Sequence, residues 1–352
     1  MKTKSVLRLG ALGAIVAVAL TAAIASPAMA DPATNDKVLN GTGSDTTQDV
    51  MNGLASVIGG TALGSWDAIG SATIQVKSGG PIFNRPNGSG NGVKALTASI
   101  NPEGTRTWGG VSITGQLDFA RSSSGPSVTG TDLTYIPFAK DAVTFAVHEA
   151  SDFPRDIPIG TAADAPTKFT LRNIYKCTVT SFSDSFGTPV TITPLIPQSG
   201  SGTRSFWQSK LGLSTEGFGT CVTDRGNTVQ EHKGDAITGV GEIVPISIAQ
   251  YIAQSNGKVN DARGYAELGK VAGKSPVVFS AGKPAMNSAF PINRSVYNVV
   301  ATSRLGDSAI AAAFVGAGSA ICSNTAEIQS YGFASLGASC GSVTTKGGYP
   351  AP

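Results

Sequence analysis

Residues 41–47 have the sequence Gly-Thr-Gly-Ser-Asp-Thr-Thr and lead directly into a helical pattern that extends from about 46 to 58. Residues 88–92 (Gly-Ser-Gly-Asn-Gly) precede a helical pattern at 93–100 in the same way, and residues 199–203 (Ser-Gly-Ser-Gly-Thr) precede another at 204–211. The N-terminus of a helix has unpaired N–H groups and a partial positive charge. Each of these helix starts therefore suits an oxyanion, for which the Ser and Thr hydroxyls are further donors.

Taken singly, each cluster is also typical of an ordinary helix cap, because Ser, Thr, Asp and Gly are the residues that caps use. Residues 41–43 lack the third glycine of a dinucleotide loop, so no nicotinamide cofactor is expected. A fourth segment, residues 117–126, places Arg121 beside Ser122 and Ser123. An arginine fork is the preferred side chain for two-point contact with an oxyanion, although a surface arginine in a polar turn explains the segment equally well.

Segments with strand-like and helix-like patterns alternate along the chain, which favours α/β architecture. The expected strands are 73–77, 142–147, 190–196, 277–280 and 296–301. Further helices are expected at 171–176, 246–255, 308–314 and 325–331. The Gly- and Pro-rich end, 344–352, is expected to be loosely held.

The first thirty residues have the pattern of a cleavable signal peptide. Lys2, Lys4 and Arg8 precede an apolar run at 9–24, and the small residues of 28–30 predict cleavage before Asp31. No cysteine follows the run for lipid attachment, so we expect a protein of the periplasm or the medium. Of 26 basic and 23 acidic residues, the signal takes three bases and no acids, which leaves 23 of each. This neutral balance excludes the basic surface of a nucleic-acid-binding protein.

About 320 residues remain after cleavage, more than one ordinary core requires, so two lobes are expected. An even number of cysteines in an oxidising compartment indicates disulfides. Three pairings of the four cysteines are possible, and we favour Cys177–Cys221 with Cys322–Cys340, because each bridge then stays within one expected lobe. No metal site is expected, since the chain has no CxxC motif and its two histidines have no ligand spacing with the cysteines.

The order of these segments resembles the phosphate-binding proteins of phosphate ABC importers, which have the type II periplasmic-binding-protein fold. The resemblance extends from about Lys37 to Ala301. It rests on residues 41–46, 88–94, 117–120 and 199–203, with further landmarks at 171–175 (Leu-Arg-Asn-Ile-Tyr) and 290–294 (Phe-Pro-Ile-Asn-Arg).

The resemblance implies an α/β protein with one lobe formed by 31–145 and 285–352, a second formed by 146–284, and a ligand cleft between them. It implies a monomer that binds phosphate or a related oxyanion without a cofactor and delivers it to an ABC permease. Together with the helix starts, it predicts these ligand-binding residues: Ser44, Asp45, Thr46, Ser89, Arg121, Ser122, Ser123, Ser201, Gly202, Thr203 and Arg204.

Three departures from the family pattern concern the anion. The family usually has an aspartate near Ser123, which accepts the proton of phosphate and so rejects sulfate. Its arginine just before the second-lobe loop is also missing, and Arg121 or Arg204 is expected to replace it. Asp45 occurs where the family often has threonine, and it either caps its helix or takes over the proton-accepting role.

Other functions remain open from the sequence. A hydrolase would use Ser201 or Ser123 with His232 or His148, but a GxSxG elbow is lacking, and the polar stretch around His232 is expected at the surface. A sugar or peptide ligand would need aromatic platforms, for which Trp66, Trp108 and Trp207 are available. A secreted interaction protein that kept the fold but not the transport role is the third alternative.

Overall fold

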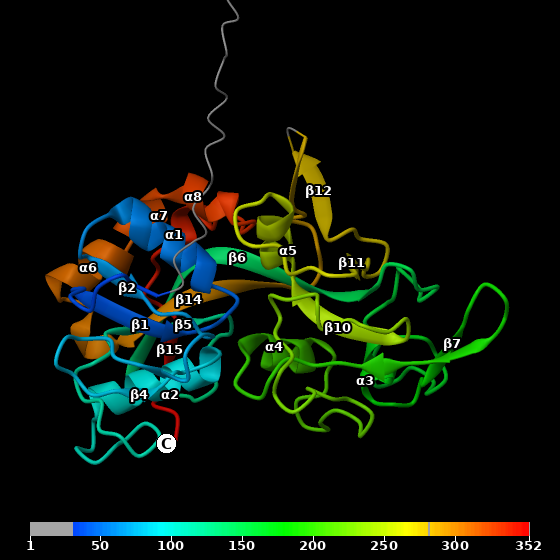
Figure 1. Cartoon of the computed structure of the whole chain (residues 1–352), viewed down its shortest axis with the longest axis horizontal. Coiled ribbons are helices and arrows are strands. Elements are labelled where there is room, and N and C mark those ends of the chain that lie inside the picture. Colours follow the sequence, from blue (N-terminus) through cyan, green and yellow to red (C-terminus); the bar gives the residue numbers. More distant parts are fainter. Residues whose placement is uncertain (1–30, 281, 352) are drawn as a thin grey trace, which may run out of the picture.

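The computed structural model describes residues 31–280 and 282–351, so the expected signal peptide at 1–30 lies outside the described residues. Figure 1 shows two α/β halves side by side, connected by the long strands β6 (Leu133–His148) and β14 (Asn293–Ala301). The chain thus has the mixed α/β architecture that the sequence predicts. Within the described ranges, no helix is both long and apolar enough to cross a membrane.

The remaining elements fall into the two halves as Figure 1 shows. The first half contains β1 (Leu39–Gly43), α1 (Gln48–Ile58), β2 (Leu63–Ser65), β3 (Thr73–Ile74), β4 (Phe83–Asn84), α2 (Ser89–Ile100), β5 (Phe119–Ser122), α6 (Ser308–Phe314), α7 (Ala320–Ser323), α8 (Thr325–Ser330) and β15 (Lys346–Gly347). The second contains α3 (Leu171–Tyr175), β7 (Ser181–Ser183), β8 (Pro189–Thr191), β9 (Thr193–Pro194), α4 (Gly202–Lys210), β10 (Glu242–Ser247), α5 (Ile248–Ser255), β11 (Ala266–Leu268), β12 (Val277–Ser280) and β13 (Lys283–Met286).

Strand β6 belongs to both halves, because it changes partners along its length. Its residues 133–142 pair antiparallel with β14, in a sheet of order β2-β1-β5-β14-β6. Its residues 143–147 pair antiparallel with β10, which continues to β9. Nearly every residue of β6 is buried, as expected for a central strand that is covered on both faces.

The hydrophobic cores follow the two halves, with one element between them. Two clusters pack on β1, β5 and β14 of the first half, and two others pack around β10 and α4 of the second. Helix α5 contributes to both, since Ile248 and Ile252 pack in the second half while Ala249 and Ala253 pack in the first. The lobe boundaries at 145 and 285 therefore remain a proposal.

Several element boundaries differ from the sequence prediction for local reasons. The helix expected from 246 begins at Ile248, because Ser247 ends β10 and caps the helix by accepting a hydrogen bond from the backbone N–H of Gln250. The strand expected at 190–196 is divided into β8 and β9. The strand expected at 73–77 shortens to β3, which spans two residues.

The prediction of a loosely held C-terminal end was wrong for its described part. Lys346 and Gly347 form β15, which pairs with the start of β6. The guanidinium of Arg106 lies 5.8 Å from the ring centre of Tyr349 and donates a hydrogen bond to the carbonyl of Pro350. Strand pairing, which the Gly- and Pro-rich composition does not indicate, therefore holds this segment.

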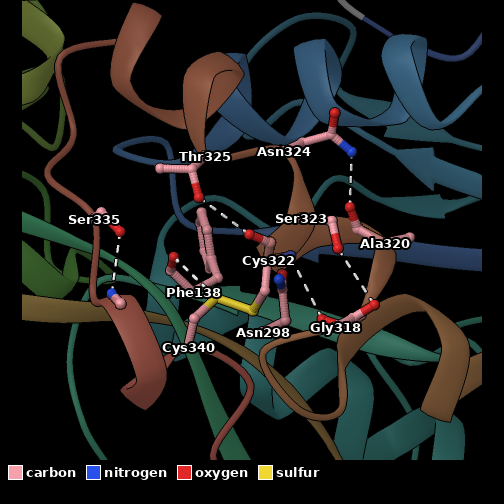
Figure 2. Close-up of a disulfide and its surroundings, with 12 residues drawn as sticks. Phe138, Asn298, Gly318, Ala320, Cys322, Ser323, Asn324, Thr325, Ser335 and Cys340 are labelled. Atoms are coloured by element: carbon pink, nitrogen blue, oxygen red, sulfur yellow. Dashed lines mark hydrogen bonds between the residues drawn. A yellow bond between two sulfur atoms is a disulfide. The ribbon is translucent and has the colours of Figure 1, made fainter.

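Both favoured disulfides are present. Cys177–Cys221 links the end of α3 to the loop after α4. Cys322–Cys340 joins α7 to the segment before β15, and Figure 2 shows it next to Phe138, whose carbonyl lies 3.5 Å from the Cys340 sulfur. Each bridge thus lies within one half of the molecule.

Two hairpins project from the second half, β7–β8 and β12–β13 (Figure 1). Their chains carry the two most exposed large hydrophobic side chains of the described residues, Phe186 (91% exposed) and Phe279 (77%).

Candidate functional site

The three helix starts predicted from the sequence meet between the two halves. The N–H of Gly90, in the first turn of α2, donates to the carbonyl of Gly200, in the loop before α4, at 3.1 Å. The β1–α1 loop packs against α2 so closely that a Cβ on Gly92 would lie 2.4 Å from the Cα of Gly43. Glycine at these positions allows loops from distant parts of the chain to approach one another.

A cluster of hydroxyls lies where α2, β5 and α4 meet. Ser89 Oγ accepts a hydrogen bond from the backbone N–H of Ser123 at 2.9 Å, and their two Oγ atoms are 3.1 Å apart. A Cβ added to Gly202 would lie 2.4 Å from Ser89 Oγ and 2.6 Å from Ser123 Oγ. The two halves are therefore in direct contact here, and the three residues are buried.

The start of α4 adds two further hydroxyls. Ser201 caps the helix, with its Oγ accepting hydrogen bonds from the N–H groups of Thr203 and Arg204. The Oγ1 of Thr203 lies 3.4 Å from the Oγ1 of Thr46 in the β1–α1 loop. Three of these residues, Ser201, Thr203 and Thr46, are almost fully buried, so their polar atoms depend on protein partners.

Arg294 of β14 supplies a positive charge to this cluster. Its Nη2 donates to Thr203 Oγ1 at 2.7 Å and lies 3.4 Å from Thr46 Oγ1. Its Nε and Nη2 also donate to Asp141 Oδ2 of β6, at 3.1 and 2.8 Å. Its Nη1 is buried and has no hydrogen-bond partner among the described residues, so this donor is available to a ligand.

Two carboxyls complete the cluster. Glu231 Oε1 accepts a hydrogen bond from Thr46 Oγ1 and its Oε2 accepts one from Ser201 Oγ, both at 2.8 Å. Burial, reinforced by the nearby Asp45 carboxyl, raises the pKa of Glu231 to about 7. Burial also raises the pKa of Asp45, whose Oδ2 lies 3.3 Å from His232 Nδ1.

The predicted surface location of Glu231 and His232 was therefore wrong. Glu231 is fully buried and His232 is 6% exposed. Burial lowers the pKa of His232. A polar stretch predicts exposure only when its polar groups lack partners in the fold, and here hydroxyls from two separate loops satisfy the Glu231 carboxylate.

A polar pocket of about 260 Å³ adjoins His232 and is lined also by Asp49, Asp67 and Gln250. Burial raises the pKa of Asp67 to about 7. A larger pocket of about 570 Å³ lies elsewhere, between α1, α8 and residues 31–33. We place the functional site at the helix starts and not at the larger pocket, because the convergent donors are at the helix starts.

Three of the predicted ligand residues have side chains engaged elsewhere. Arg121 is fully buried; its Nε and Nη1 donate to the carbonyl of Ser44 and to Ser65 Oγ, and its Nη2 has no partner among the described residues. Burial lowers its pKa to about 10. Ser122 Oγ donates to the carbonyl of Ser124. Arg204 donates to Asp224 and to the carbonyl of Pro197. Both partners lie outside the cluster, so the Arg204 side chain points away from it.

The other predicted residues lie in or next to the cluster: Ser44, Asp45, Thr46, Ser89, Ser123, Ser201, Gly202 and Thr203. Asp45 does not cap α1, since Thr47 is the N-cap residue and no side chain makes a cap hydrogen bond there. Ser44 is buried, and its Oγ has no partner within the described part of the chain.

Sequence reasoning missed Arg294 and Glu231. Arg294 is the last residue of 290–294, a landmark of the family resemblance, and this landmark is the sequence feature that points to it. Glu231 gave no signal, because its role depends on hydroxyls that are 30 and 185 residues away in sequence.

A family model described as the PBP superfamily domain matches residues 28–316. Among solved structures, the chain is similar to a putative phosphate ABC transporter substrate-binding protein with bound phosphate from Clostridium perfringens, at 15% identity over 85% of this chain and 99% of that chain, with a TM-score of 0.54. It is also similar to a phosphate-binding protein from Stenotrophomonas maltophilia, at 15% identity over 85% and 90%, with a TM-score of 0.50.

These two structures share the fold of the chain. No curated protein sequence matches the chain. The family model spans most of the chain and both halves of the molecule. The α/β architecture with β6 and β14 between the halves is that of the type II periplasmic-binding proteins. The chain belongs to the PBP superfamily.

Proposed function

We propose that this protein is an extracytoplasmic solute-binding protein that captures phosphate or a similar tetrahedral oxyanion for an ABC importer. The observation that carries the proposal is the meeting of the three helix starts. Together with the end of β5, they bring four hydroxyls (Thr46, Ser89, Ser123 and Thr203) close to the guanidinium of Arg294 in a buried cluster between the halves.

The chemistry of this cluster suits an anion held without water. Helix N-termini and hydroxyls offer neutral donors, and a short charge-assisted hydrogen bond is roughly twice as strong as a neutral one. Arg294 takes the place of the guanidinium that Arg121 or Arg204 was expected to supply. Asp141 holds the Arg294 side chain in position, which reduces the entropy lost when a ligand binds.

The export and transport parts of the proposal rest on other observations. Residues 1–30 have the signal-peptide pattern, and two disulfides suit an oxidising compartment. Two proteins of the same fold are a putative phosphate ABC transporter substrate-binding protein with bound phosphate and a phosphate-binding protein. Binding and release would require the halves to separate about β6 and β14.

The geometry favours binding over hydrolysis. The hydrolase considered from the sequence would pair a serine with a histidine. Ser201 Oγ donates instead to Glu231, and His232 Nδ1 contacts Asp45. His148 Nδ1 accepts a hydrogen bond from the backbone of Ala150.

Titration calorimetry of residues 31–352 with phosphate, arsenate, sulfate and molybdate tests the proposal. We expect at least phosphate to bind, and no binding of any of the four would refute it. Ser123→Ala should weaken phosphate binding by about 1 kcal/mol, the scale of one hydrogen bond. Ser122→Ala is the matched control, because the neighbouring hydroxyl is bonded away from the cluster and its loss should leave affinity unchanged.

A further inference from the structure

The hairpin of β12 and β13 presents apolar side chains to solvent above a fixed base. Asn287 closes the base, since its N–H donates to the carbonyl of Pro276 at 3.0 Å and its Nδ2 donates to the carbonyl of Ser275 at 2.8 Å. Further along β12, Val278 is 41% exposed and Phe279 is 77% exposed. Neighbouring residues of a strand point to opposite faces, so both faces of β12 are free of the body here. Figure 1 shows the hairpin projecting from the second half next to α5.

The chain in and around this hairpin is basic. Residues 268–306 contain no aspartate or glutamate. Three exposed lysines are in the hairpin or just before it: Lys270, Lys274 and Lys283. None of their ammonium groups makes an ion pair with a described residue. Asp156 lies at the base, where it accepts a hydrogen bond from the N–H of Gly273 at 2.9 Å, whereas Lys283 pairs with Ser280 at the outer end of the strands.

The β7–β8 hairpin has an equally exposed phenylalanine in the opposite electrostatic setting. Phe186 is 91% exposed, but residues 177–203 contain no lysine or arginine. Asp184 accepts a hydrogen bond from the N–H of Phe186 at 3.0 Å. Asp152 accepts one from the N–H of Ser185 at 2.9 Å, so two carboxyl groups lie at this tip. The two hairpins therefore differ in charge and share an exposed aromatic ring.

The chemistry of the β12–β13 tip suits the surface of an anionic membrane. A phenylalanine at the level of the headgroups buries apolar surface, and a lysine beside it is attracted to the lipid phosphates. Strand pairing from Val277–Met286 to Ser280–Lys283 already joins the backbone groups between the two strands. A protein interface usually takes about 800 Å² from each partner, which is more than two exposed apolar side chains offer. The tip therefore favours a lipid surface over a protein partner.

We propose that the β12–β13 hairpin attaches this protein to the surface of anionic lipid membranes. Phe279 and Val278 enter the headgroup layer, and the ammonium of Lys283 binds lipid phosphates while its alkyl chain lies along the apolar tip. Lys274 adds attraction from the base of the hairpin. This attachment is independent of the anion cluster between the halves, so it goes beyond the proposed function.

Co-sedimentation of residues 31–352 with lipid vesicles tests the inference. The wild type should bind vesicles that contain phosphatidylglycerol, bind pure phosphatidylcholine much more weakly, and lose affinity as salt is raised. Phe279→Ser should lower the partition coefficient at least about tenfold, because the buried ring is lost. Lys283→Gln should lower it about fivefold, the effect of one cation at an anionic surface. Phe186→Ser is the matched control and should bind as the wild type does.

The outcomes are distinct. A wild type that stays in the supernatant with both kinds of vesicle, or binds both equally, overturns the inference. Undiminished binding by Phe279→Ser, or loss of binding in Phe186→Ser, assigns the contact to another surface and overturns it as well. Both side chains are exposed, so the two variants should keep the wild-type Tm. Phosphate affinity, measured by calorimetry, should not change in Phe279→Ser, so a failure of the proposed function is read from a separate assay.

Discussion

Replacing Arg294 by glutamine should destabilise the protein by about 3 kcal/mol, because it leaves a buried carboxylate without its cation. Asp141 is fully buried and accepts two hydrogen bonds from Arg294, at 2.8 and 3.1 Å. Removing one partner of a buried ion pair typically costs about 3–5 kcal/mol. We expect the lower end, since Asp141 keeps donors from Ser247 Oγ and from the N–H of Ala249, at 2.9 and 3.2 Å.

Urea unfolding, followed by the fluorescence of the buried Trp207, measures the change in the free energy of unfolding. Adding Asp141→Asn should restore part of the loss, because the unpaired charge disappears. Arg263→Gln is the matched control: its pair with Asp261 is exposed, and its loss should cost about 0–1 kcal/mol. A loss below about 1 kcal/mol in Arg294→Gln, or strictly additive effects in the double variant, would refute the assigned role of the pair.

Three further results are expected. Gly202→Ala should lower phosphate affinity at least tenfold in calorimetry with little change in Tm, because its Cβ would push the two halves apart. Gly90→Ala is the control, since its Cβ would meet its nearest atom at 3.5 Å. Equal phosphate affinities of the two variants would contradict the close contact between the halves. Since the pKa of Glu231 is raised from 4.5 to about 7, the folded state binds this proton more tightly than the unfolded state, so Tm should fall as pH rises from about 4.5 to about 7. Glu231→Gln should reduce that slope without abolishing it, because the pKa of Asp67 is also raised to about 7; an unchanged slope would show that Glu231 does not contribute. Replacing both cysteines of Cys177–Cys221 by serine should lower the free energy of unfolding by about 4 kcal/mol, and the same change at Cys322–Cys340 should lower it by about 3 kcal/mol. The difference arises because the bridges close loops of 44 and 18 residues. The reverse order in denaturant unfolding would argue against loop entropy as the cause.

The fold and the helix starts could be predicted from the sequence, because both depend on patterns of neighbouring residues. Alternation of apolar segments predicts α/β architecture, and the Gly/Ser/Thr clusters before helices mark the places where the backbone must approach closely. Ser201 is a clear example: the same residue caps α4 in the structure and was predicted for the site from its position before the helix.

The charged part of the site could not be predicted in the same way. Arg121 was predicted for the site from its position beside serines, but its Nε and Nη1 donate to the carbonyl of Ser44 and to Ser65 Oγ, contacts that the neighbouring sequence does not indicate. Arg294 and Glu231 reach the cluster through the pairing of β14 with β6 and through the loop before β10. These are long-range contacts, which a pattern of neighbouring residues does not contain.

The partner change in β6 has a mechanical consequence. Asp141 and Arg294 face each other in the β6–β14 ladder, next to the residue where β6 leaves β14 and begins to pair with β10. If the halves rotate about this crossing, Arg294 lies close to the axis and moves little, while the β7–β8 hairpin at the far end of the second half moves much further (Figure 1). A small rearrangement around this guanidinium would then produce a large displacement at the far end of the second half.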